Sequence, residues 1–414
     1  MDLSLICLFA FGYLSILSES WLKVNKAASA LLMAILLWGV LFQGVGWEEG
    51  NLLLGTRLNE VSQIALFLLG AMTLVELVDA HEGFHLVSGW ISAVSGRLLV
   101  CVVGLLAFFL SALLDNLTTT IVLIALIRKL GFRQEHRLLL GALTVVSANA
   151  GGAWTPIGDV TTTMLWIQGN IDAVPVMKAL FLPSFGAFLV ALIWIVFSFP
   201  RQVEAAHEVE PVTEDVGKSR WVLLIGAAAL VMTPVLRACF GLPPFMGIFL
   251  GLALLWIVTD LIHWRYPHRQ HLRVHHILKQ VDTSGVLFFI GILLAIDALD
   301  GAGMLKSLAL WLDQVIGSVS VVALLIGAIS AVIDNIPLVA AGMGMYSFLP
   351  PNDHFWYLLA YAAGTGGSIL LLGSAAGIAF MQMEKVSFGW YCRYVTPMAI
   401  FSYLVGAGIY FLQR

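Results

Sequence analysis

The sequence predicts an all-α polytopic membrane protein with two inverted-topology repeats, each containing a re-entrant helical hairpin and a discontinuous transmembrane helix. Three observations predict this fold. The 414 residues are 60% hydrophobic and 11% charged, with a mean hydropathy of +0.94, which is outside the range of soluble domains. About a dozen apolar stretches approach membrane-spanning length. Two pairs, Asp115-Asn116 and Asp334-Asn335, interrupt such stretches about half a chain apart.

The first half supplies six elements. Uninterrupted apolar runs predict spans at 3–19, 27–45, 62–79 and 175–199, and the first run has no cleavage signature, so we expect it to be retained. The run 98–130 is interrupted by Asp115-Asn116 and is interpreted as a hairpin. The run 138–168 contains several glycines and Pro156, which permit or force a helix break, and predicts a discontinuous helix. We assign 1–60 to scaffold spans and 61–200 to the first repeat.

The second half repeats this order after a polar interval at 201–220, which predicts a cytoplasmic linker. Spans at 221–240 and 245–262, with a basic loop, form a scaffold segment at 221–280. The second repeat, 281–414, then contains a span at 284–300, a hairpin at 319–348, a discontinuous helix at 355–383 and a last span at 394–412. When the two Asp-Asn pairs are aligned, Ser111 also aligns with Ser330, and the glycines of the two discontinuous helices correspond.

The distribution of Lys and Arg predicts the orientation of these elements. If both hairpins enter and leave the membrane on one side, only Arg57, Lys178, Arg237, Lys306 and Arg414 of the 21 basic residues lie outside. Cytoplasmic loops carry an excess of Lys and Arg, so this arrangement is favoured over two ordinary spans. It places the N-terminus outside and gives the repeats opposite orientations, which is typical of secondary transporters.

The interrupted segments carry the oxygen ligands that alkali cations prefer. A carboxylate at the membrane centre costs about 2.5–3.5 kcal/mol and usually marks a substrate or proton site. Burial also favours the protonated form of a carboxyl group. We therefore expect Asp115, Asp159 and Asp334 to exchange H⁺ for Na⁺. The alternative is that these aspartates only cap broken helices.

The candidate cation ligands form two sets, one in each repeat, and the second set has fewer oxygen-bearing side chains. For this reason we do not expect the two sites to be equivalent. The first set is Ser111, Asp115, Asn116, Thr119, Asn149, Thr155, Asp159, Thr161 and Thr162, and the second is Ser330, Asp334, Asn335, Thr365 and Ser368, with Ser374 nearby in the sequence.

The strings SALLDNLTTT, SANAGGAWTPIGDVTTTMLW, AVIDNIPLVAAGMGMY and AGTGGSILLLGSAAG resemble NhaD-type sodium/proton antiporters of the ion transporter superfamily, which also contains arsenite and dicarboxylate carriers. The resemblance covers nearly the whole chain. It implies exchange of Na⁺ or Li⁺ for H⁺ across a bacterial inner membrane, a transport domain beside a scaffold domain, and a homodimer. Most of the candidate ligands match the family's cation site, but Ser374 stands opposite Asp159 and Gly364 stands opposite Asn149.

The sequence disfavours two other functions. An anion or metalloid carrier of the same superfamily is disfavoured because the hairpin tips are acidic and no Lys or Arg lies within the core elements. A cation channel is disfavoured because acidic pairs in inverted repeats favour alternating access. The sequence has no nucleotide-binding loop, nucleophile elbow or zinc signature. We therefore expect a secondary active transporter and no enzyme, with no cofactor and no nucleic-acid partner, in contact with membrane lipids.

A histidine-rich loop was interpreted in two ways, as a pH sensor or as a topogenic, lipid-contacting loop. The loop contains His263, His268, His271, His275 and His276 among three arginines.

Overall fold

The computed structural model describes residues 2–81, 94, 96–130, 132–200, 216–264, 272–371 and 373–413, and all regular structure in these ranges is helical. The prediction of an all-α fold is therefore confirmed for the described residues. The helices of the first half are α1 (Asp2–Leu17), α2 (Glu19–Leu22), α3 (Lys26–Val45), α4 (Trp47–Ala80), α6 (Gly96–Leu114), α7 (Asn116–Lys129), α8 (Gln134–Gly152), α9 (Val160–Ile167) and α10 (Ala173–Ser198).

The second half of the chain contains the remaining helices. They are α11 (Val216–Phe240), α12 (Pro244–His263), α13 (Val274–Ile277), α14 (Thr283–Gly301), α15 (Met304–Ile316), α16 (Val319–Ile329), α17 (Asn335–Met345), α18 (His354–Gly366), α19 (Ala375–Glu384), α20 (Phe388–Tyr394) and α21 (Thr396–Leu412).

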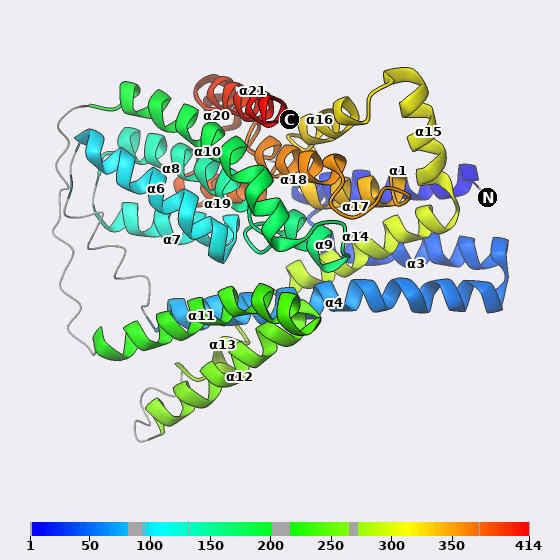
Figure 1. Ribbon diagram of the computed structural model, residues 1–414, viewed down its shortest axis with the longest axis horizontal. Helices are drawn as coiled ribbons and strands as arrows, with labels where there is room; N and C mark the ends of the chain where they lie inside the picture. Colours follow the sequence, from blue (N-terminus) through cyan, green and yellow to red (C-terminus); the bar gives the residue numbers. More distant parts are fainter. Residues whose placement is uncertain are drawn as a thin grey trace.

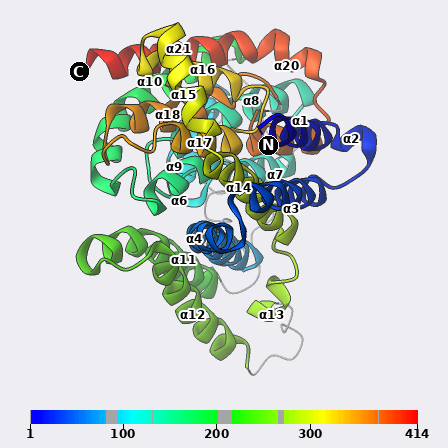
Figure 2. The ribbon, with the colours of Figure 1, turned by 90° about the vertical axis from the view of Figure 1, so that its right-hand side faces the viewer.

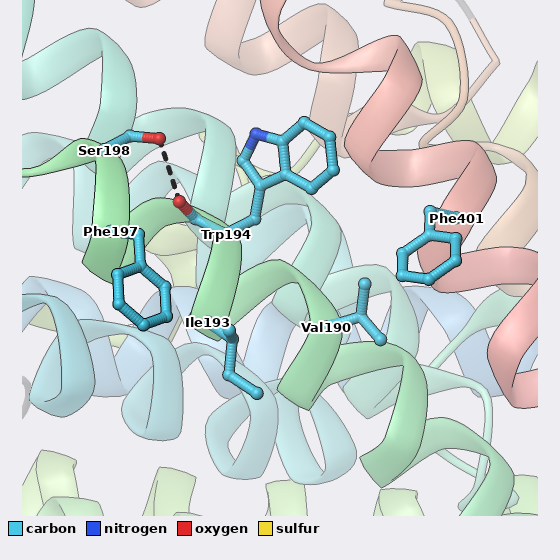
Figure 3. Close-up of a pocket in the computed structure, with 6 residues that line it drawn as sticks. All are labelled: Val190, Ile193, Trp194, Phe197, Ser198 and Phe401. Carbon is cyan, nitrogen blue, oxygen red and sulfur yellow. Dashed lines mark hydrogen bonds between the residues drawn. The ribbon is translucent and has the colours of Figure 1, made fainter.

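Seven helices in the described residues are long and apolar enough to cross a membrane, and nine spans result if each of two bent pairs is counted as one. One bent pair is α15 and α16, which meet at 110°. The apolar side chains outside the core suit a hydrocarbon environment. Figure 3 shows one group of such side chains. Trp194 and Phe197 of α10 and Phe401 of α21 line an apolar cavity of about 390 Å³.

The centre of the molecule is built around α8 and α18. Every residue of α8 from Leu140 to Gly152 is buried, and so is every residue of α18 from Phe355 to Gly366. A helix whose residues are apolar or small on all sides is stable only when other elements surround it. Helices α6, α7 and α10 pack on α8, and α16, α17 and α21 pack on α18, while α11 and α12 project from the bundle beside α4 (Figures 1 and 2).

The helix interruptions lie where the sequence predicted them. Asp115 separates α6 from α7, and Asp334 immediately precedes α17. Helix α8 ends at Gly152 and α9 begins at Val160, and likewise α18 ends at Gly366 and α19 begins at Ala375. Because these interruptions lack their own helical hydrogen bonds, they expose backbone groups and capping side chains in the interior of the protein.

Glycines permit close packing at both interruptions. A Cβ on Gly151 would lie 2.1 Å from the Phe108 carbonyl oxygen, and a Cβ on Gly366 would lie 2.0 Å from that of Gly327. Neither distance is possible for a real Cβ atom, so α8 contacts α6, and α18 contacts α16, at a spacing that only glycine allows. The two contacts occupy corresponding positions in the two halves.

Several helical regions were not predicted, among them the one-turn helices α2 and α13. Helix α4 begins at Trp47, well before the expected span at 62–79, because its polar first turns continue the helix beyond the apolar part. Helices α15 and α20 were missed because they are short and contain charged residues, such as Lys306 and Arg393. The predicted linker lies outside the described residues up to 215, and α11 already begins at Val216.

Candidate cation-binding site

Asp115 occupies a strained position at the first interruption. Its backbone φ is +105° and its ψ is 162°, a region that is almost exclusive to glycine. The Asp115 carboxylate caps α7, because the Thr118 N–H donates to Oδ1 at 2.7 Å and the Thr118 hydroxyl donates to Oδ2 at 3.0 Å. Strain of this kind persists only where the surrounding structure imposes it, and it is frequent at functional sites.

Asp159 caps the second half of the discontinuous helix. It is buried, and its Oδ1 accepts a hydrogen bond of 3.2 Å from the Thr161 N–H, while its carbonyl accepts one of 2.8 Å from the Thr162 hydroxyl. The Thr161 hydroxyl lies beside the carboxylate but outside hydrogen-bond geometry. Capping leaves much of the carboxylate available to another ligand, since each oxygen has two lone pairs.

A buried hydrogen-bonded chain connects Asp159 to both repeats. The Asn116 side-chain amide donates to Asn149 Oδ1 at 2.9 Å and approaches Asp159 Oδ2 at 3.4 Å. Asn149 in turn donates to Ser374 Oγ at 3.0 Å. Ser374 belongs to the second repeat, where it caps α19 through the Gly377 N–H at 3.2 Å. The first predicted ligand set therefore meets a side chain from the other half of the protein.

Several candidate hydroxyls instead bond to backbone carbonyls. The Ser111 hydroxyl of α6 donates to the Ala148 carbonyl of α8 at 2.6 Å, whereas the Ser330 hydroxyl lies 2.7 Å from the Gly327 carbonyl of its own helix and 3.2 Å from the Ala363 carbonyl of α18. Thr155 donates to the carbonyl of residue 112 at 2.6 Å. These hydroxyls keep their own lone pairs free, so they combine a structural role with the capacity to bind a cation.

Two further hydroxyls of α7 are buried without a hydrogen-bond partner among the described residues. They belong to Thr119 and Thr120, which follow the capped start of α7. Buried polar groups normally have partners. The oxygens of these two threonines are therefore additional candidate ligands for a group that enters the site.

The second predicted set is arranged differently. Asp334 caps α17 through a 3.3 Å hydrogen bond from the Ile336 N–H, and Asn335 is buried at the start of that helix. Thr365 donates to the Tyr361 carbonyl at 2.6 Å, and Ser368 donates to the Thr365 carbonyl at 2.6 Å, so both are engaged with their own helix or its end.

Charges near the site come from three carboxylates and one amine. Asp159 is close enough to Asp115 and Asp334 for their charges to interact. Lys26, at the start of α3, is within electrostatic range of Asp334. Sequence reasoning missed Lys26 because it lies some three hundred residues from Asp334 and outside both repeats, and only the packing of α3 on α14 and of α14 on α17 brings it near.

The structure brings Asn116, Asn149 and Asp159 into direct contact and places Asp115 and Asp334 within electrostatic reach of Asp159. It also adds Ser374. The sequence alignment places Ser374 opposite Asp159, but it does not predict the contact of Ser374 with Asn149. The signal was the capping pattern Ser374-x-x-Gly377 at the start of α19, which indicates a helix end but not what lies opposite.

A second polar group lies outside this site. Arg57 of α4 forms a short ion pair with Asp300 and lies 4.0 Å from Asp297, both on α14, beside a cavity of about 220 Å³. Among the five loop histidines, His268 and His271 lie outside the described residues. His263 Nε2 lies 3.0 Å from His81 Nε2, joining the ends of α12 and α4.

The chain is similar to known transporters over nearly its whole length. A family model described as a citrate transporter (CitMHS) matches residues 13–364. Over 99% of its length, the chain is 49% identical to sodium/proton antiporter 1 of Arabidopsis thaliana, of which it covers 72%. It is 47% identical to sodium/proton antiporter 2 of that plant, with 97% of each protein covered. It is also 28% identical to the Na⁺/H⁺ antiporter NhaD of Vibrio cholerae over 98% of this chain and 91% of that protein. These findings confirm the resemblance to NhaD-type antiporters.

Proposed function

The chain belongs to the citrate transporter (CitMHS) family, and we propose that it exchanges Na⁺ or Li⁺ for H⁺ by competition of cation and proton for buried aspartates. It is a multi-pass membrane protein and a secondary transporter rather than an enzyme. Relatives named sodium/proton antiporters support the choice of ions. Li⁺ is included because the same hard oxygen ligands suit both alkali cations.

The observation that carries the proposal is the buried chain from Asp159 through Asn116 and Asn149 to Ser374. It collects carboxylate, amide and hydroxyl oxygens in the interior, where Asp159 and Ser374 cap α9 and α19. The charges of Asp115 and Asp334 are close enough to repel that of Asp159. Binding of Na⁺ or of protons relieves that repulsion, and occupancy by one lowers the affinity for the other, which is the basis of antiport.

We also propose that the two halves are inverted repeats with re-entrant hairpins. Corresponding pairs of helices make corresponding contacts, since α6 packs on α8 as α16 packs on α18, and α7 packs on α19 as α17 packs on α9. The Ser111 and Ser330 hydroxyls lie beside corresponding carbonyls, those of Ala148 at 2.6 Å and Ala363 at 3.2 Å, although the nearer acceptor of Ser330 is the Gly327 carbonyl at 2.7 Å. Arg128 and Arg137, both predicted to be cytoplasmic, pair with Glu384, which adjoins Lys385, another residue predicted to be cytoplasmic; this cluster supports the predicted orientation.

A second candidate function is transport of a carboxylate such as citrate, which the description of the family model favours. Lys26 is the nearest positive charge to the site and would be the first residue required by an anion. However, no Lys or Arg forms a hydrogen bond or an ion pair with Asp115, Asp159 or Asp334 in the part of the chain that the structure describes. An acidic pocket disfavours a polyanion, so the cation function is preferred.

For the cellular setting we propose the bacterial inner membrane and a homodimer. The similarity to two proteins of Arabidopsis thaliana makes membrane fractionation of the native source the direct test of location. Cross-linking in the native membrane tests the dimer.

The proposed function is tested in everted vesicles or proteoliposomes with an internal pH dye. A preformed proton gradient is challenged with Na⁺, Li⁺, K⁺ or citrate. Wild-type protein is expected to dissipate the gradient with Na⁺ and Li⁺. Loss of a carboxylate about 4 Å from a cation, at an effective dielectric constant of about 20, costs roughly 4 kcal/mol, or about a thousandfold in affinity. The variant Asp159→Asn is therefore expected to show little exchange at any accessible Na⁺ concentration.

The matched control is Asp353→Asn. Asp353 caps α18 through the Phe355 N–H at 2.9 Å, so this change is chemically identical but lies at the start of α18 and outside the ligand set. It is expected to leave exchange unchanged, because Asn is as good an N-cap as Asp. Asp159→Ser adds a second test. Serine suffices as a cap at the aligned position, where Ser374 caps α19, so this variant should keep the cap of α9 but lose the carboxylate. Normal exchange by Asp159→Ser would mean that Asp159 only caps α9, and a response to citrate alone would favour the anion carrier.

A further inference from the structure

An apolar cavity of about 790 Å³ lies between α6, α10 and the projecting helix α11. Its walls include Phe109 of α6, Val174 of α10 and Val231 of α11, which are 50%, 58% and 52% exposed. Exposed apolar side chains in a membrane protein indicate that the cavity opens towards the lipid. The volume is within the range of about 300–1,000 Å³ that ligand pockets occupy.

One end of this cavity carries a positive charge without a hydrogen-bond partner. Arg237, in the last turn of α11, lines the cavity, and its Nη1 atom is buried with no hydrogen-bond acceptor among the described residues. The guanidinium carbon lies 4.9 Å from the centre of the Trp166 ring, which fixes the side chain in place. A buried guanidinium nitrogen of this kind is costly unless an acceptor is supplied from outside the chain.

A negative charge lines the same end. Asp172, at the start of α10, lies within electrostatic range of Arg237, and one of its carboxylate oxygens accepts a 2.7 Å hydrogen bond from Asn352. The cavity therefore presents an apolar body with one cation and one anion at its end. Both charged residues stand at helix termini on the predicted outer side, which is the depth of lipid headgroups.

We propose that this cavity binds a zwitterionic phospholipid of the phosphatidylethanolamine class. Arginine binds phosphate oxygens through its planar set of donors, so the lipid phosphate supplies the acceptor that Nη1 lacks. The ammonium group of the headgroup then faces Asp172, and an acyl chain fills the space between Phe109, Val174 and Val231. A purely anionic headgroup satisfies Arg237 but is repelled by Asp172.

The bound lipid would contact the interruption between α8 and α9, which forms part of the cation site. Thr155, Pro156 and Ile157 line the cavity, and they belong to the interruption between α8 and α9. The acyl chain would lie between this interruption and α11 and would exclude water from that side of the interruption. In this proposal the lipid is a structural component bound between α6, α10 and α11, and it is not a transported substrate.

The test is native mass spectrometry of the delipidated full-length protein after incubation with an equimolar mixture of phosphatidylethanolamine, phosphatidylglycerol and phosphatidylcholine. Wild-type protein is expected to retain phosphatidylethanolamine preferentially. Arg237→Gln is expected to lower its retention about tenfold or more, because a charge-assisted hydrogen bond is lost. Arg237→Lys, which keeps the charge but not the planar donors, gives an intermediate loss. Asp172→Asn is expected to shift the preference towards phosphatidylglycerol.

Two further variants separate the headgroup from the acyl chain. Lys178→Gln removes an exposed charge of α10 that does not line the cavity, and it is expected to leave retention unchanged. Val231→Trp fills the cavity without altering Arg237 and is expected to reduce retention of all three lipids. Equal retention by wild type, Arg237→Gln and Val231→Trp would overturn the proposal, as would an equal loss in Lys178→Gln.

Discussion

Replacing Asp115 by glycine is expected to stabilise the protein and to abolish its transport. The φ of +105° at Asp115 places a side chain in a backbone region where it costs about 1–3 kcal/mol. Glycine removes that cost. The carboxylate's cap on Thr118 is lost, but a change from Asp to Gly at an N-cap costs only about a few tenths of a kcal/mol. The net effect is a gain of roughly 1–2 kcal/mol in folding free energy.

Two companion variants isolate the strain. Asp115→Asn removes the charge, and with it the repulsion towards Asp159, but keeps the strained side chain. The difference in stability between Asp115→Gly and Asp115→Asn therefore reports the relieved strain, less the few tenths of a kcal/mol of the cap that Asn retains. Asp353→Gly makes the same substitution at an N-cap with an ordinary φ of −61°, where no strain can be relieved. It is expected to lower stability slightly.

The assay is the apparent thermal midpoint of purified protein in detergent, measured beside Na⁺/H⁺ exchange in proteoliposomes. We expect the midpoint of Asp115→Gly to exceed those of Asp115→Asn and wild type by a few degrees, while exchange is lost in both Asp115 variants. If Asp115→Gly is as destabilised as Asp353→Gly, the backbone at residue 115 is not strained and the reasoning fails. If Asp115→Gly still transports, the carboxylate is not part of the exchange.

Three other changes give distinct expectations. Ser374→Ala leaves the buried Asn149 amide donor unsatisfied, which costs about 1–3 kcal/mol in stability. The apparent KM for Na⁺ should also rise, although Ser374 lies in the second half of the chain. An unchanged KM and thermal midpoint would exclude the contact. Gly366→Ala should prevent accumulation of folded protein, because its Cβ would collide with a backbone oxygen, whereas Gly39→Ala, with open space around it, should be tolerated in a fluorescence size-exclusion assay. Arg137→Gln removes the nearer of the two arginines beside the buried Glu384 carboxylate and leaves Arg128 at 3.8 Å, so we expect a loss of about 1.5–3 kcal/mol in stability, the value of a hydrogen bond to a charged group. The double variant with Glu384→Gln should recover most of this loss, and no recovery would indicate a role for Arg137 other than this ion pair.

Local sequence signals were sufficient to locate the interruptions. The Asp-Asn pairs cap helix starts in the structure, so a pattern that predicted ion chemistry also predicted where α7 and α17 begin. Glycine spacing likewise predicted the breaks after α8 and α18, because glycine weakens a helix locally. The capping role and the proposed binding role of the aspartates are compatible, since a capped carboxylate retains free lone pairs.

Contacts between distant segments were not predictable in this way. The hydrogen bond from Asn149 to Ser374 joins residues from opposite halves, and nothing in the periodicity of either segment indicates it. The same is true of Lys26 beside Asp334. Helix α4 shows a further limit, because helices continue into polar sequence beyond the membrane-embedded part and a hydropathy threshold detects only the apolar portion.

The exchange of partners between the halves has a consequence for how this protein could have arisen. Helix α7 packs on α19 and α17 packs on α9, so each half of the chain covers helices of the other half. If the proposed repeats derive from one half-length chain, that chain would have been complete only as a pair. Fusion into one chain would then allow each copy to change alone, and Ser374, which accepts from Asn149 and aligns with Asp159, is one position where the two halves differ.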